Sequence, residues 1–172
     1  QQVKRFASGV TWAQTFAAAP TSLGHRVLLW YAEAKGWPLR EGDVSTSFLH
    51  ADLPKDTLII VRPADCIYQR MLWVLRKALY GLKIAPQCFQ RWFADQMKSL
   101  KFDRCAADPQ LFHRKRDGTL DLTHADDYRL AAAEANADPV QKEIASKMKI
   151  RWDRELGEPW TPFLGLLWRR LS

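Results

Sequence analysis

Cysteine is scarce in this chain, and its spacing excludes two classes of small, cross-linked domain. The three cysteines, Cys66, Cys88 and Cys105, are an odd number and form no C-x-x-C pair. A disulfide framework or a structural zinc site is therefore not expected, and an intracellular, reducing compartment is favoured. The chain also lacks an apolar stretch long enough to span a membrane and a secretory pattern at its N-terminus, so we expect neither a membrane contact nor secretion.

Internal repeats, low-complexity tracts and Gly/Ser-rich linkers are also absent from the sequence. The length of 172 residues fits one domain with a sizeable core. A composition of 47% hydrophobic and 26% charged residues is typical of a globular protein. Eight tryptophans and eight phenylalanines indicate a well-filled interior, aromatic groups available for contacts, or both.

Acidic residues are fewer than basic ones, which bears on the kind of partner. The chain has 26 Lys and Arg against 19 Asp and Glu, a formal net charge of +7. A basic balance favours polyanionic partners, because neutralising phosphates releases condensed counterions. Charge alone leaves open the alternative of a solvated basic surface without such a partner.

Two helices are predicted in the first hundred residues. The first spans residues 22–35, with Ser22 as N-cap and Gly36 at its end. Its expected inward face consists of Leu23, Val27, Leu28 and Tyr31. The second spans residues 86–101, with Pro86 in its first turn. Its apolar stripe consists of Phe89, Trp92, Phe93, Met97 and Leu100.

Strands and hairpins are predicted around and after these helices. Residues 37–42 lead into a short strand that ends near Asp43, and residues 58–61 form an apolar, β-branched strand closed by Pro63. The dipeptide Asp117-Gly118 is a strong hairpin signal between strands at residues 110–114 and 119–123.

The rest of the chain predicts one more tight turn, one helix and one strand. Asp126 and Asp127 fall in a turn between residues 119–125 and the apolar residues 128–132. Asp138 then caps a helix that opens with Pro139 and buries Val140, Ile144 and Met148. Residues 163–168 form a last short strand. Mixed helices and strands with local hairpins indicate an α+β fold rather than a doubly wound sheet.

Three carboxylates are the candidate chemical centre. Asp43 lies at a strand end, and Asp126 and Asp127 lie at a hairpin tip. Adjacent acids repel each other, so such a pair requires a cation or water. Carboxylates from separate strands that hold two divalent metals are what in-line phosphoryl transfer requires. A bare Asp-Asp dipeptide is also consistent with a solvated turn, and only its context separates the two interpretations.

Four segments supply that context. They are Gly42–Leu53 (GDVSTSFLHADL), Leu79–Pro86 (LYGLKIAP), Asp108–Phe112 (DPQLF), and the pair Leu156-Gly157 with Phe163–Gly165 (FLG). In this order they resemble the D-V-x-T-A-F-L-x-G-x-L, Y-G-L-K-Q-A-P, D-x-x-L-F and L-G…F-L-G blocks of copia-type retrotransposon reverse transcriptases. The resemblance covers residues 4–168.

The resemblance implies an RNA-directed DNA polymerase with a palm-like antiparallel sheet packed on helices, partial fingers and no thumb. Asp43, Asp126 and Asp127 would be catalytic and would hold two Mg²⁺ ions, for which Mn²⁺ can substitute, with the carbonyl of Val44 as a further ligand. Phe48 would stack under the sugar of the incoming dNTP and exclude a 2′-hydroxyl; the residues alone equally allow a core aromatic.

The remaining implied roles concern the primer and template. Tyr80, Gly81 and Pro86 would shape the floor under the templating pair, and residues 163–165 would help hold the primer end. The partners would be an RNA or DNA template with its primer and dNTPs, in a cytoplasmic particle or the nucleus.

The resemblance also implies a domain layout. Residues 1–172 would form a single reverse-transcriptase-like domain, with residual fingers and the first palm helix over about 1–40. The palm would cover 41–172, with a fingers segment at about 54–86 inserted into it. The chain would open inside the fingers and stop before the thumb and any ribonuclease H domain, so we expect it not to extend a primer alone.

The sequence departs from the family pattern beside the acids. The family's Tyr-Val before the Asp pair is His124-Ala125 here, and the Gln after Lys83 is Ile84. His124 could stack on the primer or hydrogen-bond to it, or the change could be drift in a decaying copy. Two other interpretations stay open: a non-catalytic nucleic-acid-binding remnant, and an unrelated basic α+β structural domain.

Overall fold

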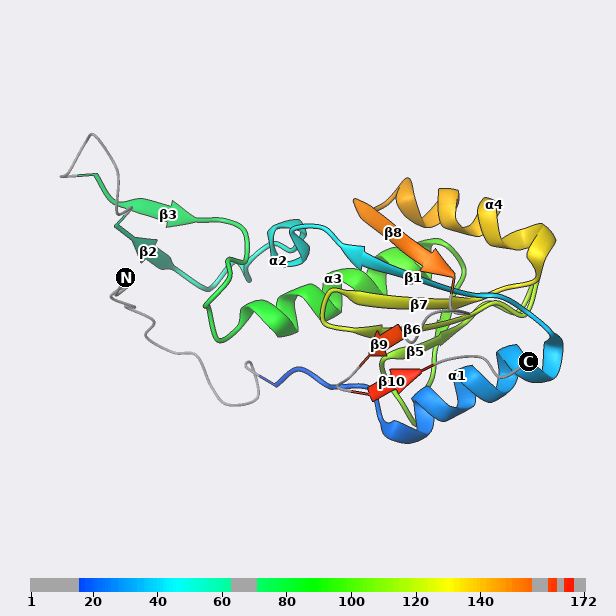
Figure 1. Ribbon diagram of the computed structural model, residues 1–172. Helices are drawn as coiled ribbons and strands as arrows, with labels where there is room; N and C mark the ends of the chain where they lie inside the picture. Colours follow the sequence, from blue (N-terminus) through cyan, green and yellow to red (C-terminus); the bar gives the residue numbers. More distant parts are fainter. Residues whose placement is uncertain (1–15, 63–70, 156–160, 164–165, 169–172) are drawn as a thin grey trace. The chain divides into compact units, whose positions relative to one another are not determined.

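The computed structural model describes residues 16–62, 71–155, 161–163 and 166–168 (Figure 1). The chain divides into two compact units: residues 1–17 with 46–93, and residues 18–45 with 94–172. Within the described residues, no helix is both long and apolar enough to cross a membrane.

The larger unit is built on a six-stranded antiparallel sheet with the order β4-β5-β6-β7-β1-β8 (Figure 1). Its strands are β1 (Leu39–Val44), β4 (Asp103–Arg104), β5 (Leu111–His113), β6 (Leu120–His124), β7 (Asp127–Ala131) and β8 (Ile150–Glu155). The hairpin expected at Asp117-Gly118 joins β5 to β6, and the turn at Asp126 joins β6 to β7. The combination of helices with an antiparallel sheet that contains local hairpins confirms the predicted α+β class.

Helix α1 (Ser22–Lys35) has the predicted bounds but a different cap and a different inward face. Thr21, rather than Ser22, is the N-cap, and its hydroxyl accepts a hydrogen bond from the Gly24 N–H at 2.8 Å. Leu23 and Val27, which were expected to face inward, are exposed. The buried face consists of Gly24, His25, Leu28 and Ala32. It packs on the sheet in a core cluster of Leu28, Ala32, Leu39, Leu111, Leu120, Leu122 and Ala131.

A buried carboxylate anchors the start of α1. Asp108 accepts hydrogen bonds from the backbone N–H and the hydroxyl of Thr21, at 2.9 and 2.8 Å, and from the Gln110 N–H at 3.0 Å. A Cβ at Gly24 would lie 2.1 Å from the Asp108 carboxylate. The contact therefore requires glycine at position 24, and it gives Asp108 a structural role in the DPQLF segment.

Helix α4 (Glu134–Ala145) begins five residues earlier than predicted, so the expected cap at Asp138 was wrong. Pro139 lies inside the helix, and the N-cap Ala133 makes no side-chain hydrogen bond. Glu134 lies in the first turn, where a negative charge stabilises the helix. Arg40 of β1 pairs with Glu134 at 3.5 Å and with Asp138 at 3.2 Å. α1 and α4 lie on opposite sides of the sheet (Figure 1).

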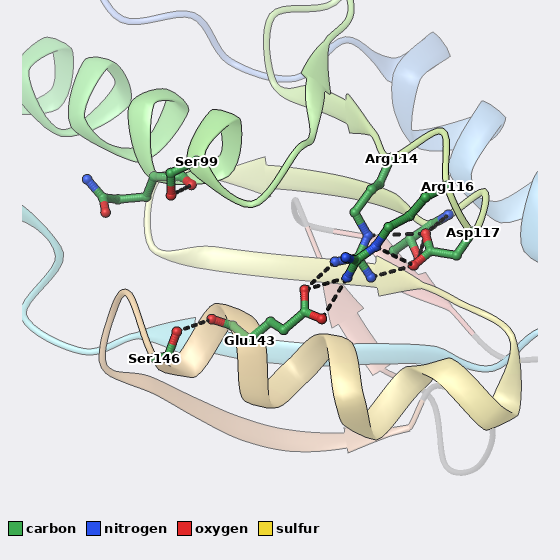
Figure 2. Close-up of polar contacts among 8 residues, drawn as sticks. Ser99, Arg114, Arg116, Asp117, Glu143 and Ser146 are labelled. Atoms are coloured by element: carbon green, nitrogen blue, oxygen red, sulfur yellow. Dashed lines mark hydrogen bonds and ion pairs between the residues drawn. The ribbon is translucent and has the colours of Figure 1, made fainter.

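A network of arginines and carboxylates joins the β5–β6 hairpin to α4 (Figure 2). Arg114 is 1% exposed and binds Asp117 through two nitrogens, at 3.1 and 2.5 Å. Its third contact is Glu143 of α4 at 2.6 Å, and Arg116 reaches the same carboxylate at 2.6 and 2.7 Å. The Arg114 guanidinium also lies 4.9 Å from the ring centroid of Phe102.

The predicted strand at residues 163–168 is instead two short strands. β9 (Thr161–Phe163) and β10 (Leu166–Trp168) pair antiparallel, with Leu166 opposite Phe163. Residues 164 and 165, to which a primer-holding role was assigned together with Phe163, lie outside the described residues, as do residues 156–157 and Pro63.

The smaller unit contains α2 (Ser47–His50), β2 (Ile59–Val61) and β3 (Trp73–Leu75), and α3 (Ala85–Ser99) begins in it. β2 and β3 form a two-stranded antiparallel sheet, which matches the strand expected at residues 58–61. α3 ends two residues before the predicted helix end. Its stripe was phased correctly, because Phe89, Phe93 and Met97 are buried and Trp92 and Leu100 are half-buried.

Candidate functional site

Three parallel rows of side chains cross one face of the large sheet. Residues directly opposite each other in an antiparallel pair share a face, with Cβ atoms about 4.5–5.5 Å apart. The register of β6, β7 and β1 defines the rows Leu120–Ala131–Leu39, Leu122–Arg129–Glu41 and His124–Asp127–Asp43. The first row is apolar and lies under α1, the second holds a buried ion pair, and the third carries the acids.

The acid row lies at the strand ends, where the face opens to solvent. Asp127 is exposed, and Asp43 and His124 are half-buried. The β6–β7 loop is the two residues Ala125-Asp126, and the Val44 N–H donates to the Asp126 carbonyl at 2.8 Å. The backbones of Asp43, Asp126 and Asp127 therefore adjoin at one end of the sheet.

Electrostatics at Asp127 reflects this proximity. Burial raises the pKa of the Asp127 carboxyl, and the charges of Asp126 and Asp43 raise it further. His124 and Arg129 act in the opposite direction. Like charges that share a site favour a bound cation or proton, so the strand ends form a negatively charged centre.

Strained backbone lies next to the acids in two places, the β6–β7 turn and the segment that follows β1. Ala125 has φ 54°, in the left-handed region that non-glycine residues rarely adopt. Thr46, three residues after Asp43, also has φ 54°. Strained residues of this kind cluster at functional sites, where the surrounding structure enforces them.

The row behind the acids is a buried charge network. Arg129 is fully buried and forms an ion pair with Glu41, which lies opposite it on β1. Arg129 also lies 3.3 Å from Nε2 of the buried His25 of α1. Burial lowers the pKa of His25 to about 4, and the charge of Arg129 acts in the same direction, so His25 is neutral and accepts this hydrogen bond. Glu41 and Arg129 thus connect α1 to the strands that carry Asp43 and Asp127.

Neither Arg129 nor Glu41 was among the residues predicted from the sequence. The signal was present, because each lies two positions from an acid in a strand, and side chains two apart share a face. A charged residue at such a position predicts a polar partner on the neighbouring strand.

Gly42 allows β8 to approach β1 on the opposite face. Gly42 faces Tyr128 of β7 and Trp152 of β8, whose rings meet edge to face with centroids 5.3 Å apart. A Cβ at Gly42 would lie 2.9 Å from the Arg151 carbonyl oxygen and 3.1 Å from the Trp152 ring. Close packing of β8 on β1 therefore requires glycine at the position before Asp43.

Gly42→Ala is expected to lower the free energy of unfolding by about 1–3 kcal/mol, because the added methyl group overpacks the β1–β8 contact. Urea denaturation of both proteins measures the difference. Gly36→Ala is the control, since its Cβ meets nothing within 4 Å and its only cost is the left-handed φ of 61°. Equal stability of Gly42→Ala and the unmodified chain would show that β8 does not pack closely on β1.

The predicted nucleotide-contacting residues lie mostly in the smaller unit, where Phe48 and Tyr80 are neighbours. Their ring centroids lie 4.6 Å apart, and the Phe48 and Phe89 centroids lie 6.1 Å apart. The Tyr80 hydroxyl lies 3.2 Å from that of Ser47. Phe48 is half-buried in this aromatic group, so the contacts are compatible with a packing role and with a binding role.

The other predicted contact residues are placed by their backbone. Val44 is buried at the end of β1, with its N–H bonded to Asp126. Gly81 is exposed and has φ 89°, a conformation that favours glycine. Pro86 is the second residue of α3, where a missing N–H costs nothing.

The chemical type of the oxygen ligands at the acid row fits a hard divalent cation. Asp43 and Asp127 are carboxylates directly opposite each other, and Mg²⁺ prefers oxygen ligands of this type. Within the described part of the chain, no group of three or more His, Cys, Asp or Glu side chains is arranged to hold a metal ion. The facing pair is thus the part of the predicted ligand set that the sheet register places together.

Comparison with known proteins gives one family and several relatives. The family described as reverse transcriptase (RNA-dependent DNA polymerase) matches residues 4–166. The chain is 32% identical over 114 residues to the retrovirus-related Pol polyprotein from transposon RE1 of Arabidopsis thaliana, a match that covers 65% of this chain and 8% of that protein. It is 28% identical over 167 residues to the corresponding polyprotein from transposon RE2 of the same plant, covering 95% of this chain and 11% of that protein.

A third relative is the retrovirus-related Pol polyprotein from transposon TNT 1-94 of Nicotiana tabacum. It is 27% identical over 110 residues, which cover 62% of this chain and 8% of that protein. The chain therefore spans only about a tenth of the length of these relatives, at 8–11%.

Proposed function

Because the chain belongs to the reverse transcriptase (RNA-dependent DNA polymerase) family, as a copia-type member, we propose that it is a palm-like part of an RNA-directed DNA polymerase. Its reaction would be the addition of a deoxynucleotide to a primer paired with an RNA or DNA template. The observation that carries the proposal is the β1–β7 register, which sets Asp43 opposite Asp127 at an open end of the sheet.

The acids would act by holding and orienting the reacting groups. Two divalent metal ions, when bound, would activate the primer 3′-hydroxyl and neutralise the leaving pyrophosphate. Asp43, Asp126 and Asp127 would hold them, with the Val44 carbonyl as a further ligand. Such a centre would function only where the template, primer and triphosphate are positioned together, since orientation supplies much of the rate.

Phe48 and Tyr80 are the proposed nucleotide contacts. Phe48 would lie under the sugar and exclude a 2′-hydroxyl, and Tyr80, Gly81 and Pro86 would line the floor below the templating pair. The contact between the Phe48 and Tyr80 rings supports a common surface for these roles.

A second candidate function is nucleic-acid binding without catalysis. The net charge of +7 and the exposed Lys149 and Arg151 beside the acids favour binding of a polyanion whether or not chemistry occurs. The His124-Ala125 replacement, at the turn that presents Asp126, is compatible with a centre that has lost its catalytic activity.

The experiment is a titration of the chain with Mn²⁺ by calorimetry, followed by primer extension. Asp43→Asn is expected to weaken Mn²⁺ affinity about tenfold or more, a loss of about 1.4 kcal/mol, because one of two facing carboxylates is neutralised. Asp95→Asn, an exposed carboxylate of α3, is the control and is expected to bind like the unmodified chain. Equal affinities for Asp43→Asn and the control would refute the metal centre.

Primer extension with Mg²⁺ or Mn²⁺ separates the two candidates, with Asp126→Asn as the blank. Extension above the blank supports the polymerase. Salt-sensitive binding of primer and template supports the second candidate if there is no extension above the blank and Asp43→Asn loses no Mn²⁺ affinity.

A further inference from the structure

The acid row continues onto a fourth strand, where it ends in a cation. Asp43 of β1 lies opposite Asp127 on one side and opposite Arg151 of β8 on the other. The full row is therefore His124–Asp127–Asp43–Arg151 on one face, across β6, β7, β1 and β8. Arg151 is exposed, and β8 is the edge strand of the sheet.

A second cation lies one step further along the same edge. The Ser45 N–H donates to the Lys149 carbonyl at 2.9 Å, which continues the β1–β8 ladder beyond Val44 and Ile150. Lys149 is exposed, and it lies two positions from Arg151, so both side chains belong to the same face. The edge beside the acids is thus positively charged, whereas the turn at Asp126 on the other side is negative.

We propose that Arg151 is a phosphate-binding residue of this site, holding a phosphate of a nucleic-acid strand or of a nucleoside triphosphate beside Asp43. The inference rests on the proposed function, and it adds a residue that the resemblance does not supply. A guanidinium has five N–H donors in a planar fork, and one carboxylate engages at most two of them. Arg151 is exposed opposite Asp43, so its guanidinium can meet a phosphate that approaches Asp43 from the β8 side.

The position of Arg151 also reduces the electrostatic repulsion between the acids and a phosphate. A phosphate that approaches Asp43, Asp126 and Asp127 meets three carboxylates at the same end of the sheet. A fixed cation within one strand spacing of Asp43 offsets this repulsion on the side of β8. Lys149, one step further out, extends the attraction along the edge.

The test measures binding, by fluorescence anisotropy, of a labelled primer–template duplex in the presence of Mg²⁺ at several salt concentrations. The unmodified chain, Arg151→Gln, Arg151→Lys and Arg26→Gln are compared. Arg26 is an exposed arginine of α1 in the same unit, outside the row. Loss of one phosphate contact is expected to reduce the slope of log affinity against log salt by about 0.9 for Arg151→Gln. Arg151→Lys should retain the slope, and Arg26→Gln should match the unmodified chain.

A second arm titrates a fluorescent deoxynucleoside triphosphate with Mg²⁺ and no duplex, which identifies the source of the phosphate. Weaker triphosphate binding by Arg151→Gln with an unchanged duplex slope assigns the contact to the nucleotide, and the reverse result assigns it to the strand. Thermal unfolding of each variant confirms that the fold is intact.

The outcomes separate this inference from the proposed function. If Asp43→Asn abolishes Mg²⁺-dependent binding while Arg151→Gln behaves like Arg26→Gln in both arms, the inference is wrong and the proposed function stands. If the unmodified chain binds neither duplex nor triphosphate in a Mg²⁺-dependent manner, both are wrong.

Discussion

Arg114→Met is expected to lower the free energy of unfolding by about 3–5 kcal/mol, because it removes the buried cation that Asp117 and Glu143 share and leaves both carboxylates with weaker partners. Arg114 is 1% exposed and makes three short contacts to two carboxylates. Asp117 is the partner most affected. Burial opposes its charge, but hydrogen bonds from Arg114 and Thr119 hold the pKa of Asp117 below its ordinary value. Methionine retains much of the side-chain volume, so the change isolates the charge and its hydrogen bonds.

Arg116→Met is the matched control for this measurement. Arg116 binds the same Glu143 carboxylate, at 2.6 and 2.7 Å, but its side chain is 55% exposed (Figure 2). Exposed ion pairs contribute little, since water solvates the partner when the pair is broken. Urea denaturation is expected to show a large loss for Arg114→Met and a small one for Arg116→Met. Similar small losses of stability for both variants would mean that the buried Arg114 guanidinium does not hold the β5–β6 hairpin to α4.

Elements defined by local signals were predicted well. The bounds of α1 follow from a hydroxyl residue before the helix and Gly36 after it, where the chain reaches φ 61°. The β5–β6 hairpin follows from Asp117-Gly118, with Gly118 at φ 74°. The acids fell at strand ends for the same reason, because strand lengths and turn residues fix where a strand stops.

Elements defined by distant partners were not predicted. The inward face of α1 was misjudged because His25 is buried by its contact with Arg129, 104 positions away in the chain. Gly24 faces inward because the Asp108 carboxylate occupies the space that a side chain would fill. The helical spacing of apolar residues indicates neither contact. It therefore predicts that the apolar Leu23 and Val27 face inward.

β8 was missed for a related reason. Its sequence, IRWDRE, is rich in charge, and apolar and polar residues alternate only over its first four positions. The strand forms because Gly42 lets it approach β1 and because Trp152 meets Tyr128 across that glycine. The same strand brings Arg151 beside Asp43, so a residue of the candidate site depended on an element that the sequence pattern indicates only over four residues.

Acidification is expected to destabilise the larger unit through His25. The folded-state pKa of His25 is lowered from the ordinary 6.5 to about 4, first by burial and second by the charge of Arg129. Between these values the unfolded chain takes up a proton that the folded chain does not. His25 therefore contributes full stability above about pH 6.5, and this contribution falls progressively as the pH drops toward 4.

The expected loss through His25 between pH 7 and pH 4 is about 2–3 kcal/mol. The proton would place a second positive charge against Arg129, which forms an ion pair with Glu41. α1 would then release from the face of the sheet that also carries Asp43 and Asp127.

The measurement is urea denaturation of the unmodified chain and His25→Gln at a series of pH values from 7 to 4. Glutamine presents an oxygen that accepts from Arg129 but takes up no proton in this range. His25→Gln is expected to lose less stability with acid than the unmodified chain. The difference between the two curves isolates His25, because the carboxylates that titrate at low pH are common to both. Parallel curves would show that His25 is protonated in the folded chain without cost, and that its contact with Arg129 does not hold α1 to the sheet.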